Sequence, residues 1–378
     1  MHTLYVVSKG YYPSTAQNNR YLAFFKGFGE LNILVKVLYL LPNETQSKPK
    51  GPLNNVEFIY LWEGTIHKNK FYIFLRSIML LLKYIKKDSN VLLDYEKLLE
   101  LVPLPFLRVR LYHERTEHPD VVRDTSSMLS NIMHKMYLYN CRKLSGLFVI
   151  TNNLKEYFVS KGVKREKIAV INMLVDNHRF ESVKINNNVE KYLAYCGTIS
   201  IEKDGVVDLI KAFAKISLAV DDIKLYIIGD FISNRDRDII LNYVESCQLK
   251  DKIVFTGKVD FCQMPQLLTD AQALILTRPD NQQAAYGFPT KLGEYLMSAR
   301  PTIVTRVGEI DLFLEDMKTA LIAEPNNIDS IVEKTIWVLQ NSEKANKIGI
   351  NGKSVALSSF NYKIEANKII NYIMSINS

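Results

Sequence analysis

The strongest constraint on the fold is an alternation of short apolar runs with longer stretches of helical period. In the first of two such series, apolar runs cover residues 4–8, 33–41, 56–61, 91–93, 109–112 and 146–150, and helical periods cover 20–30 and 126–143. Apolar runs separated by amphipathic helices are typical of parallel strands joined by crossover helices. The series therefore predicts a parallel α/β sheet in the N-terminal half of the chain.

A second series follows a polar stretch at 179–191 that we interpret as a domain linker. Its apolar runs cover 192–196, 224–228, 253–256, 273–277 and 302–304, and its helical periods cover 206–219 and 237–245. The expected fold class is therefore α/β, with two Rossmann-like doubly wound domains that face a cleft. We expect the first domain to cover residues 1–183 and the second 184–360, followed by an amphipathic helix at 361–378.

The composition excludes several classes of protein. With 378 residues, of which 47% are hydrophobic and 23% charged, the chain can bury real cores and is not intrinsically disordered. The net charge of +8 suits a phosphorylated ligand or an anionic membrane, and without a nucleic-acid motif we expect no nucleic-acid partner. The four cysteines form no C-x-x-C pair and the N-terminus has no signal-peptide pattern, so both features favour the cytoplasm.

The most informative motif lies at residues 286–296. Gly287 allows a tight turn, and Pro289 fits the first turn of a helix. The free N–H groups of such a turn bind anions, and Lys291 adds a positive charge there. Glu294 lies one helical turn further on, where a carboxylate can accept hydrogen bonds from ribose hydroxyls. The motif therefore predicts a nucleotide site; the alternative is a surface Lys–Glu pair on an ordinary helix.

This motif closely resembles the donor-site signature of retaining glycosyltransferases of family 4. Further segments resemble that family in the same order along the chain, at residues 150–153, 170–172, 175–176, 195–198, 202–205, 209–213, 226–229 and 254–257. The resemblance covers nearly the whole chain. It implies the GT-B fold, with an acceptor-binding first domain, a nucleotide-sugar-binding second domain and a final helix that crosses back to the first.

The resemblance also implies roles for individual residues. The residues implied for the nucleotide-sugar site are Gly197, Lys203, Gly287, Phe288, Lys291 and Glu294. Glu294 would hold the ribose, and Gly287 and Phe288 would offer backbone N–H groups. Lys203 would meet the diphosphate. The resemblance implies no cofactor and no metal, since the nucleotide-diphosphate sugar is a substrate.

Two positions depart from the family's pattern. Tyr286 stands where the family usually has a second Glu that reaches the donor sugar. Thr198 stands where the family has an Arg, so Lys203 and Lys291 would carry most of the charge that meets the leaving group. Both departures bear on which sugar is transferred.

Ionisable residues gather directly after the apolar run at 109–112. Such a cluster at the end of a strand predicts a functional loop at the sheet edge. The resemblance places His113 beside the reacting sugar, and Glu114 is the second catalytic candidate. We expect the acceptor side to include Glu117, His118 and, from the first loop, Gly10. The alternative is a charged loop that caps the next helix.

The resemblance implies a retaining, metal-independent hexosyltransferase. Its donor would be a nucleotide-diphosphate sugar and its acceptor a hydroxyl group, in the synthesis of a cell-surface polysaccharide or a lipid-linked glycan. One alternative is a nucleotide-sugar epimerase of the same fold. Another is a non-enzymatic nucleotide-binding partner subunit, in which Tyr286 marks a dead site.

Two further features suggest surface roles. Residues 71–87 combine an apolar face with basic residues, which suits peripheral contact with the inner face of an anionic membrane. The alternative is a helix that packs on its own sheet. Residues 236–238 have D-x-D spacing, but they begin a predicted helix, where Asp is favourable without a metal.

Overall fold

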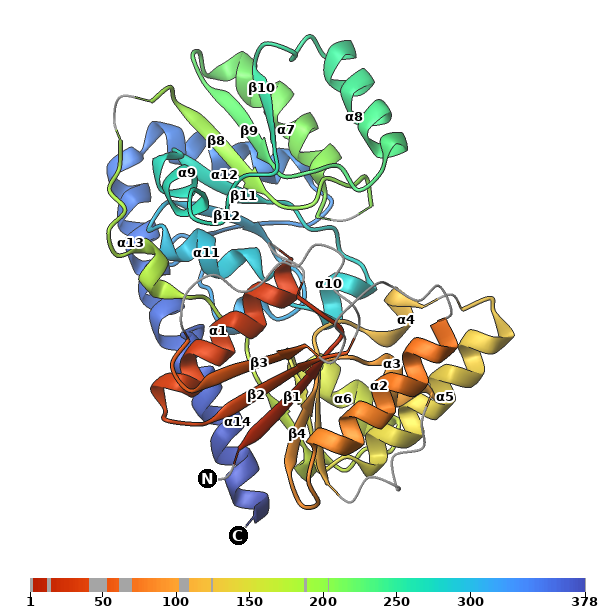
Figure 1. The fold of residues 1–378 in the computed structure, drawn as a ribbon. Coiled ribbons are helices and arrows are strands. Elements are labelled where there is room, and N and C mark those ends of the chain that lie inside the picture. Colours follow the sequence, from red (N-terminus) through yellow and green to blue (C-terminus); the bar gives the residue numbers. More distant parts are fainter. Residues whose placement is uncertain are drawn as a thin grey trace. The chain divides into compact units, whose positions relative to one another are not determined.

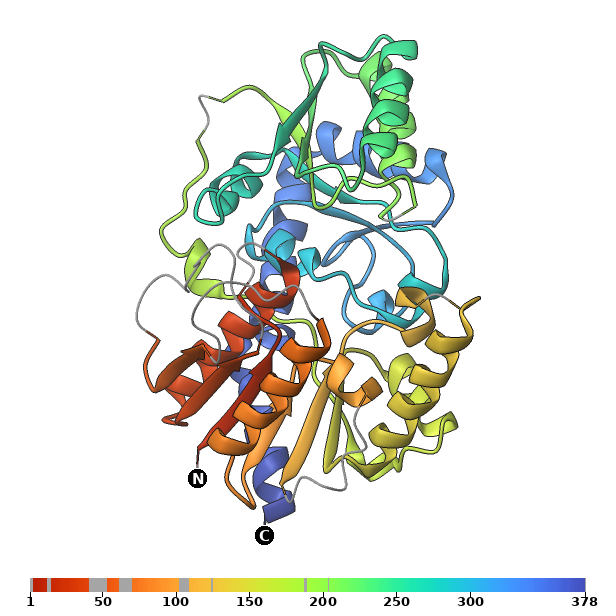
Figure 2. The ribbon, with the colours of Figure 1, turned by 45° about the vertical axis from the view of Figure 1, so that its right-hand side comes forward.

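A computed structural model describes residues 3–11, 15–40, 53–60, 70–101, 109–123, 125–186, 189–202 and 204–377. The chain divides into two compact units, an N-terminal unit of residues 1–172 and 362–378 and a C-terminal unit of residues 173–361. Each unit has one parallel sheet with helices on both faces (Figures 1 and 2). The expected α/β fold class with two Rossmann-like domains is therefore confirmed. The division at 172–173 precedes the expected boundary at residue 183.

The N-terminal sheet has seven parallel strands in the order β3-β2-β1-β4-β5-β6-β7. Their bounds are β1 Leu4–Ser8, β2 Val35–Tyr39, β3 Val56–Tyr60, β4 Asn90–Leu93, β5 Arg110–Arg115, β6 Gly146–Val149 and β7 Ile168–Val170. Every residue of β1, β4 and β6 is buried. Burial on both faces explains why these strands read as continuous apolar runs.

Helices cover both faces of this sheet. Their bounds are α1 Ala16–Glu30, α2 Lys70–Tyr84, α3 Lys97–Leu101, α4 Pro119–Val122, α5 Met128–Lys143, α6 Asn152–Ser160 and α14 Tyr362–Asn377. Helices α1 and α14 lie on one face, and α2, α3 and α5 lie on the other (Figure 1). Thr15 caps α1, because its hydroxyl accepts a hydrogen bond from the Asn18 N–H at 3.3 Å.

The C-terminal sheet has six parallel strands in the order β10-β9-β8-β11-β12-β13. Its strands are β8 Tyr192–Cys196, β9 Lys224–Ile228, β10 Ile253–Gly257, β11 Ala273–Leu276, β12 Thr302–Thr305 and β13 Leu321–Ala323. Its helices are α7 Val206–Ala219, α8 Asn234–Ser246, α9 Met264–Asp270, α10 Gln282–Tyr286, α11 Lys291–Met297, α12 Ile328–Gln340 and α13 Ser342–Ser359. The order places the switch point of the sheet between β8 and β11.

The last helix, α14, packs against α1 in the N-terminal unit, as the resemblance implied. The backbones approach so closely that a Cβ on Gly27 would lie 2.7 Å from the Cβ of Ala366. The fully buried Glu365 carboxylate accepts a hydrogen bond from the Asn172 N–H at 2.8 Å. Burial raises the pKa of Glu365. Close packing and this buried hydrogen bond thus fix the helix to the first sheet.

Candidate functional site

The candidate site of the C-terminal unit lies where β8 and β11 end. In open α/β sheets, ligands bind at the carboxyl ends of the strands where the strand order reverses. Here this edge carries a turn at Asp204 and Gly205, in which both residues have positive φ angles of 59° and 66°. The Thr277 hydroxyl donates to the carbonyl of Asp204 at 3.1 Å or to that of Gly205 at 2.8 Å. These contacts fix the turn at the end of β11.

Glycine is required at position 205 for a second reason. A Cβ there would lie 1.9 Å from the Thr277 carbonyl oxygen, which belongs to the backbone and cannot rotate away. Helix α7 begins with the next residue, Val206. The turn therefore holds the Asp204 carboxylate, which is only 5% exposed, at the switch point.

Lys291 reaches this carboxylate from the first turn of α11. Its ammonium group forms an ion pair with Asp204 and donates a hydrogen bond to the Tyr195 hydroxyl at 3.1 Å. The Tyr195 hydroxyl in turn donates to Asp204 at 3.1 Å. Burial, followed by the charge of Asp204, raises the pKa of Tyr195 well above its usual value. Arg278 adds a second cation, with its Nε 3.5 Å from Asp204.

Gly197 makes room for the lysine. A Cβ at this position would lie 2.0 Å from the Lys291 ammonium nitrogen and 2.8 Å from the Tyr195 hydroxyl. The structure thus brings Gly197 and Lys291 together, as expected for one site. Lys203, which was also expected at this site, lies outside the described residues.

Glu294 lies on the same helix as Lys291 but has a different partner. It forms an ion pair with Arg179, whose guanidinium also donates to the Phe261 carbonyl at 2.6 Å and stacks on the Phe261 ring at 3.4 Å. The second carboxylate oxygen of Glu294 has no partner among the residues that the structure describes. Glu294 therefore presents one oxygen that is held and one that is available.

Residues 287–290, just before α11, were expected to offer backbone N–H groups from Gly287 and Phe288, and the structure shows a different arrangement. The Gly287 N–H donates to the Gln283 carbonyl at 3.0 Å, so it is already used at the end of α10. The Phe288 side chain packs between the rings of Phe313 and Phe360, with centroids 5.3 and 5.5 Å away. Helix α11 begins at Lys291 rather than at the preceding proline. The segment is thus anchored by its aromatic side chain.

The D-x-D segment has a structural role. The Asp236 carboxylate lies in the first turn of α8, and accepts hydrogen bonds from the Ser233 hydroxyl at 3.0 Å and the Ile201 N–H at 3.2 Å. Within the described parts of the chain, no three His, Cys, Asp or Glu side chains are grouped so that they could hold a metal ion.

The switch point of the N-terminal sheet lies between β1 and β4, and Asp94 directly follows β4. Its carboxylate accepts hydrogen bonds from the Ser8 hydroxyl at 2.6 Å and from the Gln17 amide. Burial raises the pKa of Asp94 to about 6, because a carboxylate loses solvation there and Glu114 adds negative charge. The sequence analysis missed Asp94, although an acidic residue directly after a predicted strand is a usable signal.

His113 lies inside a strand. The prediction that His113 and Glu114 belong to a loop is wrong, because β5 continues to Arg115. The His113 side chain is 1% exposed, and its Nδ1 lies 2.8 Å from the Leu93 carbonyl oxygen. Burial lowers its pKa to about 4, so the ring is neutral at pH 7. A neutral ring that donates from Nδ1 has an accepting Nε2, and this atom has no partner among the described residues.

Glu114 forms a buried ion pair with Arg20 of α1, with 2.8 Å between nitrogen and oxygen. Arg20 also donates to the carbonyls of Asn172 and Ile171 at 3.0 and 3.1 Å. These contacts explain how a strand can carry charged residues in the interior. They connect β5 to α1 and to the end of the N-terminal unit.

The remaining acceptor-side candidates follow two different strands, His118 and Glu117 after β5 and Gly10 after β1. His118 is buried and caps α4, where its Nδ1 accepts from the Asp120 N–H at 3.2 Å, so the helix-capping alternative holds for this residue. The Glu117 carbonyl accepts from Arg115 at 2.8 Å. Gly10 is buried just after β1.

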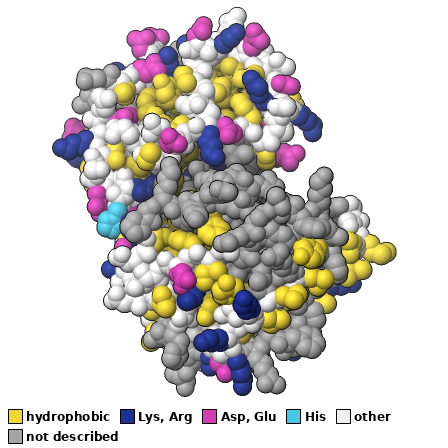
Figure 3. Space-filling view, viewed as in Figure 1, with side chains coloured by type: hydrophobic (Ala, Val, Ile, Leu, Met, Phe, Trp, Pro, Cys, Tyr) yellow, Lys and Arg dark blue, Asp and Glu magenta, His cyan; other side chains and the backbone are white. Residues whose placement is uncertain are grey.

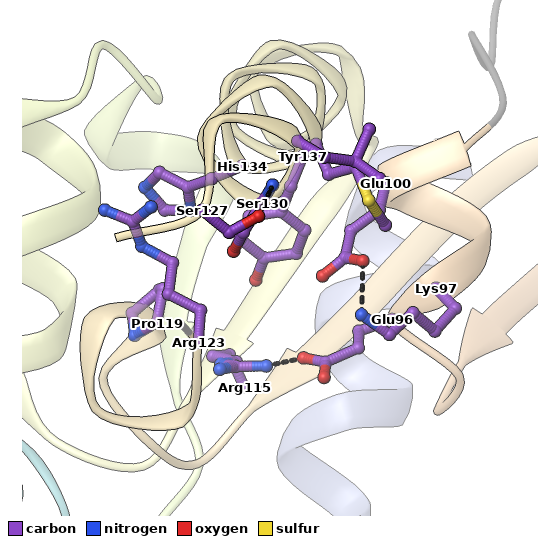
Figure 4. Close-up of a pocket in the computed structure, with 12 residues that line it drawn as sticks. Glu96, Lys97, Glu100, Arg115, Pro119, Arg123, Ser127, Ser130, His134 and Tyr137 are labelled. Carbon is purple, nitrogen blue, oxygen red and sulfur yellow. Dashed lines mark hydrogen bonds and ion pairs between the residues drawn. The ribbon is translucent and has the colours of Figure 1, made fainter. Parts of the chain in front are cut away.

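A polar cavity of about 270 Å³ lies between the start of α3, α4 and the first turns of α5 (Figure 4). Arg115 and Lys97 line it and pair with Glu96 and Glu100, the latter pair at 2.6 Å. Arg123 pairs with Asp120 at 2.5 Å. Because the cations have acidic partners, the cavity suits a neutral, hydroxyl-rich group better than a free anion.

Two aromatic side chains of α5, His134 and Tyr137, form one wall of the cavity. The Tyr137 hydroxyl has no oxygen or nitrogen partner among the described residues, although it is buried. The Tyr137 ring lies 5.8 Å from that of His113 and 6.2 Å from that of His134. The cavity and the buried His113 therefore share one wall.

Comparisons with known proteins show similarity in sequence and in fold. Residues 177–355 match the model of the family described as glycosyl transferases group 1. The chain is 26% identical over 155 residues to N-acetyl-α-D-glucosaminyl L-malate synthase of Bacillus anthracis, which is 41% of this chain and 38% of that protein. It is 27% identical over 216 residues to an uncharacterised glycosyltransferase of Methanocaldococcus jannaschii, which is 54% of this chain and 55% of that protein.

The chain thus matches about half or less of the length of these curated relatives. The similarity of fold extends further. The structure of HepE from Anabaena in complex with UDP-glucose has a TM-score of 0.75 at 13% identity, over 99% of this chain and 100% of that one. The family match covers residues 177–355, and the similarity to HepE over the whole chain shows a shared fold.

Proposed function

We propose that the protein is a retaining, metal-independent glycosyltransferase that moves a sugar from a nucleotide diphosphate to a hydroxyl acceptor. The observation that carries the proposal is the Lys291–Asp204 ion pair at the switch point of the C-terminal unit. It lies inside the segment that matches the glycosyltransferase family. HepE, which has a similar fold, binds UDP-glucose.

The donor diphosphate binds beside Lys291. Lys291 and Arg278 both lie against the Asp204 carboxylate, so two cationic side chains are held at the switch point. Negative charge develops on the departing diphosphate in the transition state, and fixed cations stabilise it. Asp204 and Tyr195 hold the lysine in place before the ligand arrives, and Lys203 supplies further charge.

The ribose of the donor binds at Glu294. Its available oxygen accepts hydrogen bonds from the ribose hydroxyls, and Arg179 fixes the orientation of the carboxylate. The Arg179–Phe261 stack provides a flat surface beside this carboxylate for the nucleobase. Tyr286, at the end of α10, replaces the acidic contact to the donor sugar.

The N-terminal unit supplies the groups that meet the acceptor. His113 packs against Tyr137 of the cavity wall and acts on the acceptor side through that contact. Asp94, with a pKa of about 6, is the carboxylate best suited to accept a proton near neutral pH. Glu114 acts as a positioning residue, because Arg20 already holds its carboxylate.

Product analysis with a panel of UDP-, GDP- and ADP-sugars tests the function. We expect one donor to be consumed in the presence of an acceptor, with the anomeric configuration kept. Conversion of the donor alone to an isomeric sugar nucleotide would identify an epimerase instead. Binding without any turnover would identify a partner subunit. In that case, activity gained in Tyr286→Glu would show that the site has lost a catalytic group.

A further inference from the structure

Helix α5 carries an unusual outward face. Its large exposed side chains occur at helical spacing in the first two turns, where Met128 is 79% exposed, Leu129 65% and Ile132 57%. The same face continues with the exposed Lys135 and Tyr139. Isolated exposed apolar residues are ordinary, but a contiguous patch marks an interaction surface. Figure 3 shows hydrophobic side chains gathered at the tip of the N-terminal unit where α5 begins.

Helix α2 repeats this pattern on the same face of the sheet (Figure 2). Its exposed large side chains are Tyr72, Leu75, Met79 and Leu82, which recur every three or four residues, and Met79 is 70% exposed. The exposed residues Lys83, Lys86 and Lys87 follow at its end. Both helices therefore combine exposed apolar side chains with basic residues near their C-terminal ends.

Charge indicates what covers this face. Neither α2 nor α5 contains an Asp or Glu, whereas α5 alone carries Lys135, Arg142 and Lys143. Apolar side chains with basic residues beside them complement an anionic lipid surface. The acidic side chains at α3 on the same face, Glu96 and Glu100, are paired with Arg115 and Lys97. A helix C-terminus favours cations in any case, but this does not explain the exposed apolar side chains.

The cavity of Figure 4 adjoins this face. Leu129 lines the cavity and is also part of the exposed patch, and Ser130, Met133 and His134 of the same helix line its wall. We propose that the outward faces of α2 and α5 bind an anionic lipid surface, so that the cavity opens next to acceptors anchored in that surface. The inference of a lipid-anchored acceptor rests on the proposed glycosyl transfer. The inference that the face binds lipid is independent of that function.

Flotation with vesicles tests the contact without donor or acceptor. We expect the full chain to float with phosphatidylcholine vesicles that contain phosphatidylglycerol, at least about tenfold more than with phosphatidylcholine alone. The binding should disappear near 1 M salt, where charges are screened within about 3 Å. The double variants Leu129→Glu/Ile132→Glu and Met79→Glu/Leu82→Glu should each stay with the unbound protein.

Leu218→Glu provides the matched control, because Leu218 is 87% exposed on α7 of the C-terminal unit. This variant should float like the unchanged protein, and circular dichroism should show the same fold for all variants. Absence of flotation at low salt, or equal flotation of the α2, α5 and control variants, would overturn the proposal. So would a concentration-dependent dimer in sedimentation that the α2 or α5 variants abolish, since the face would then bind a second copy. Nucleotide binding, measured separately, reports on the proposed function.

Discussion

The ammonium group of Lys291 forms an ion pair with the buried carboxylate of Asp204, although the two residues are 87 positions apart in the sequence. This contact joins the turn before α7 to the first turn of α11 at the switch point of the C-terminal sheet. The basic residue expected to meet the diphosphate is thus held in place by an acidic residue that the sequence motif did not single out. The pairing gives the first prediction.

Gly197→Ala should weaken nucleotide binding and, because Gly197 has a φ of 158° that L residues rarely adopt, should also lower stability, but less than Gly205→Ala does. The new Cβ meets the Lys291 ammonium at 2.0 Å, and the flexible lysine can move away only by leaving Asp204. Titration calorimetry with UDP and the melting temperature measure the two effects. Gly205→Ala is the contrasting variant, because its Cβ meets a backbone carbonyl at 1.9 Å that cannot rotate away as a lysine side chain can. It should lower the free energy of unfolding by about 2 kcal/mol or more. Equal effects of both substitutions on stability would contradict this account.

Glu294→Gln should weaken nucleotide binding about tenfold, since a neutral amide makes weaker hydrogen bonds to ribose than a carboxylate and also loses the charge that attracts Arg179. Calorimetry with UDP, and then with uracil, separates the ribose contact from the base contact. Glu333→Gln, an exposed position on α12, is the control and should bind as the unchanged protein does. An unaltered affinity in Glu294→Gln would remove this carboxylate from the site.

His113→Asn should lower turnover with donor affinity nearly kept, and it should also flatten the acid limb of the stability curve. The pKa of His113 is about 4 in the folded protein, so between pH 6.5 and 4 the unfolded state binds a proton that the folded state does not. His113 therefore contributes stability above pH 6.5 that is lost as the pH falls, by about 3 kcal/mol at most. Urea unfolding between pH 4 and 8 measures the slope; an unchanged slope in the variant would show that this ring is not responsible.

Asp94→Asn should change the pH dependence of the free energy of unfolding in the opposite direction. Burial raises the folded pKa of Asp94 to about 6, so its contribution to stability is present below pH 4 and is lost as the pH rises through 6. The free energy of unfolding of the variant should therefore exceed that of the unchanged protein at pH 8, by about 3 kcal/mol at most, and the difference should shrink toward pH 4. If Asp94 accepts the proton of the acceptor, transfer should fall in the same variant while UDP binding stays unchanged.

Most of the fold could be predicted from the sequence because buried parallel strands read as continuous apolar runs. The bounds expected for β1, β8, α7 and β9 agree with the structure. The end of β5 was missed because His113 and Glu114 are polar, and their partners, the Leu93 carbonyl and Arg20, lie far away in the sequence. Periodicity does not record such partners.

The candidate site could be predicted only in part, for the same reason. Lys291 and Glu294 belong to a local motif with a recognisable spacing. Arg179 lies in the polar stretch that was interpreted as a linker, and its partner Glu294 is 115 residues further on. Asp204 becomes informative only when the turn brings it to Lys291. That the two sheet edges share one cleft stays a prediction.

The membrane prediction from residues 71–87 stays a prediction. No helix within the described residues combines enough length and apolar character to cross a bilayer. The exposed side chains of α2 agree with an interfacial helix, and α5, which the sequence analysis did not connect with membranes, presents a similar face.

The central claim is that the C-terminal unit binds a nucleotide-diphosphate sugar through Lys291. Its most direct test is calorimetry of the full chain with UDP-, GDP- and ADP-sugars, in parallel with the variant Lys291→Gln. The account predicts saturable binding of at least one sugar nucleotide, weakened at least about tenfold in the variant, because a charge-assisted contact to the diphosphate is lost. If no sugar nucleotide binds the unchanged protein, or if Lys291→Gln binds equally well, the account is contradicted.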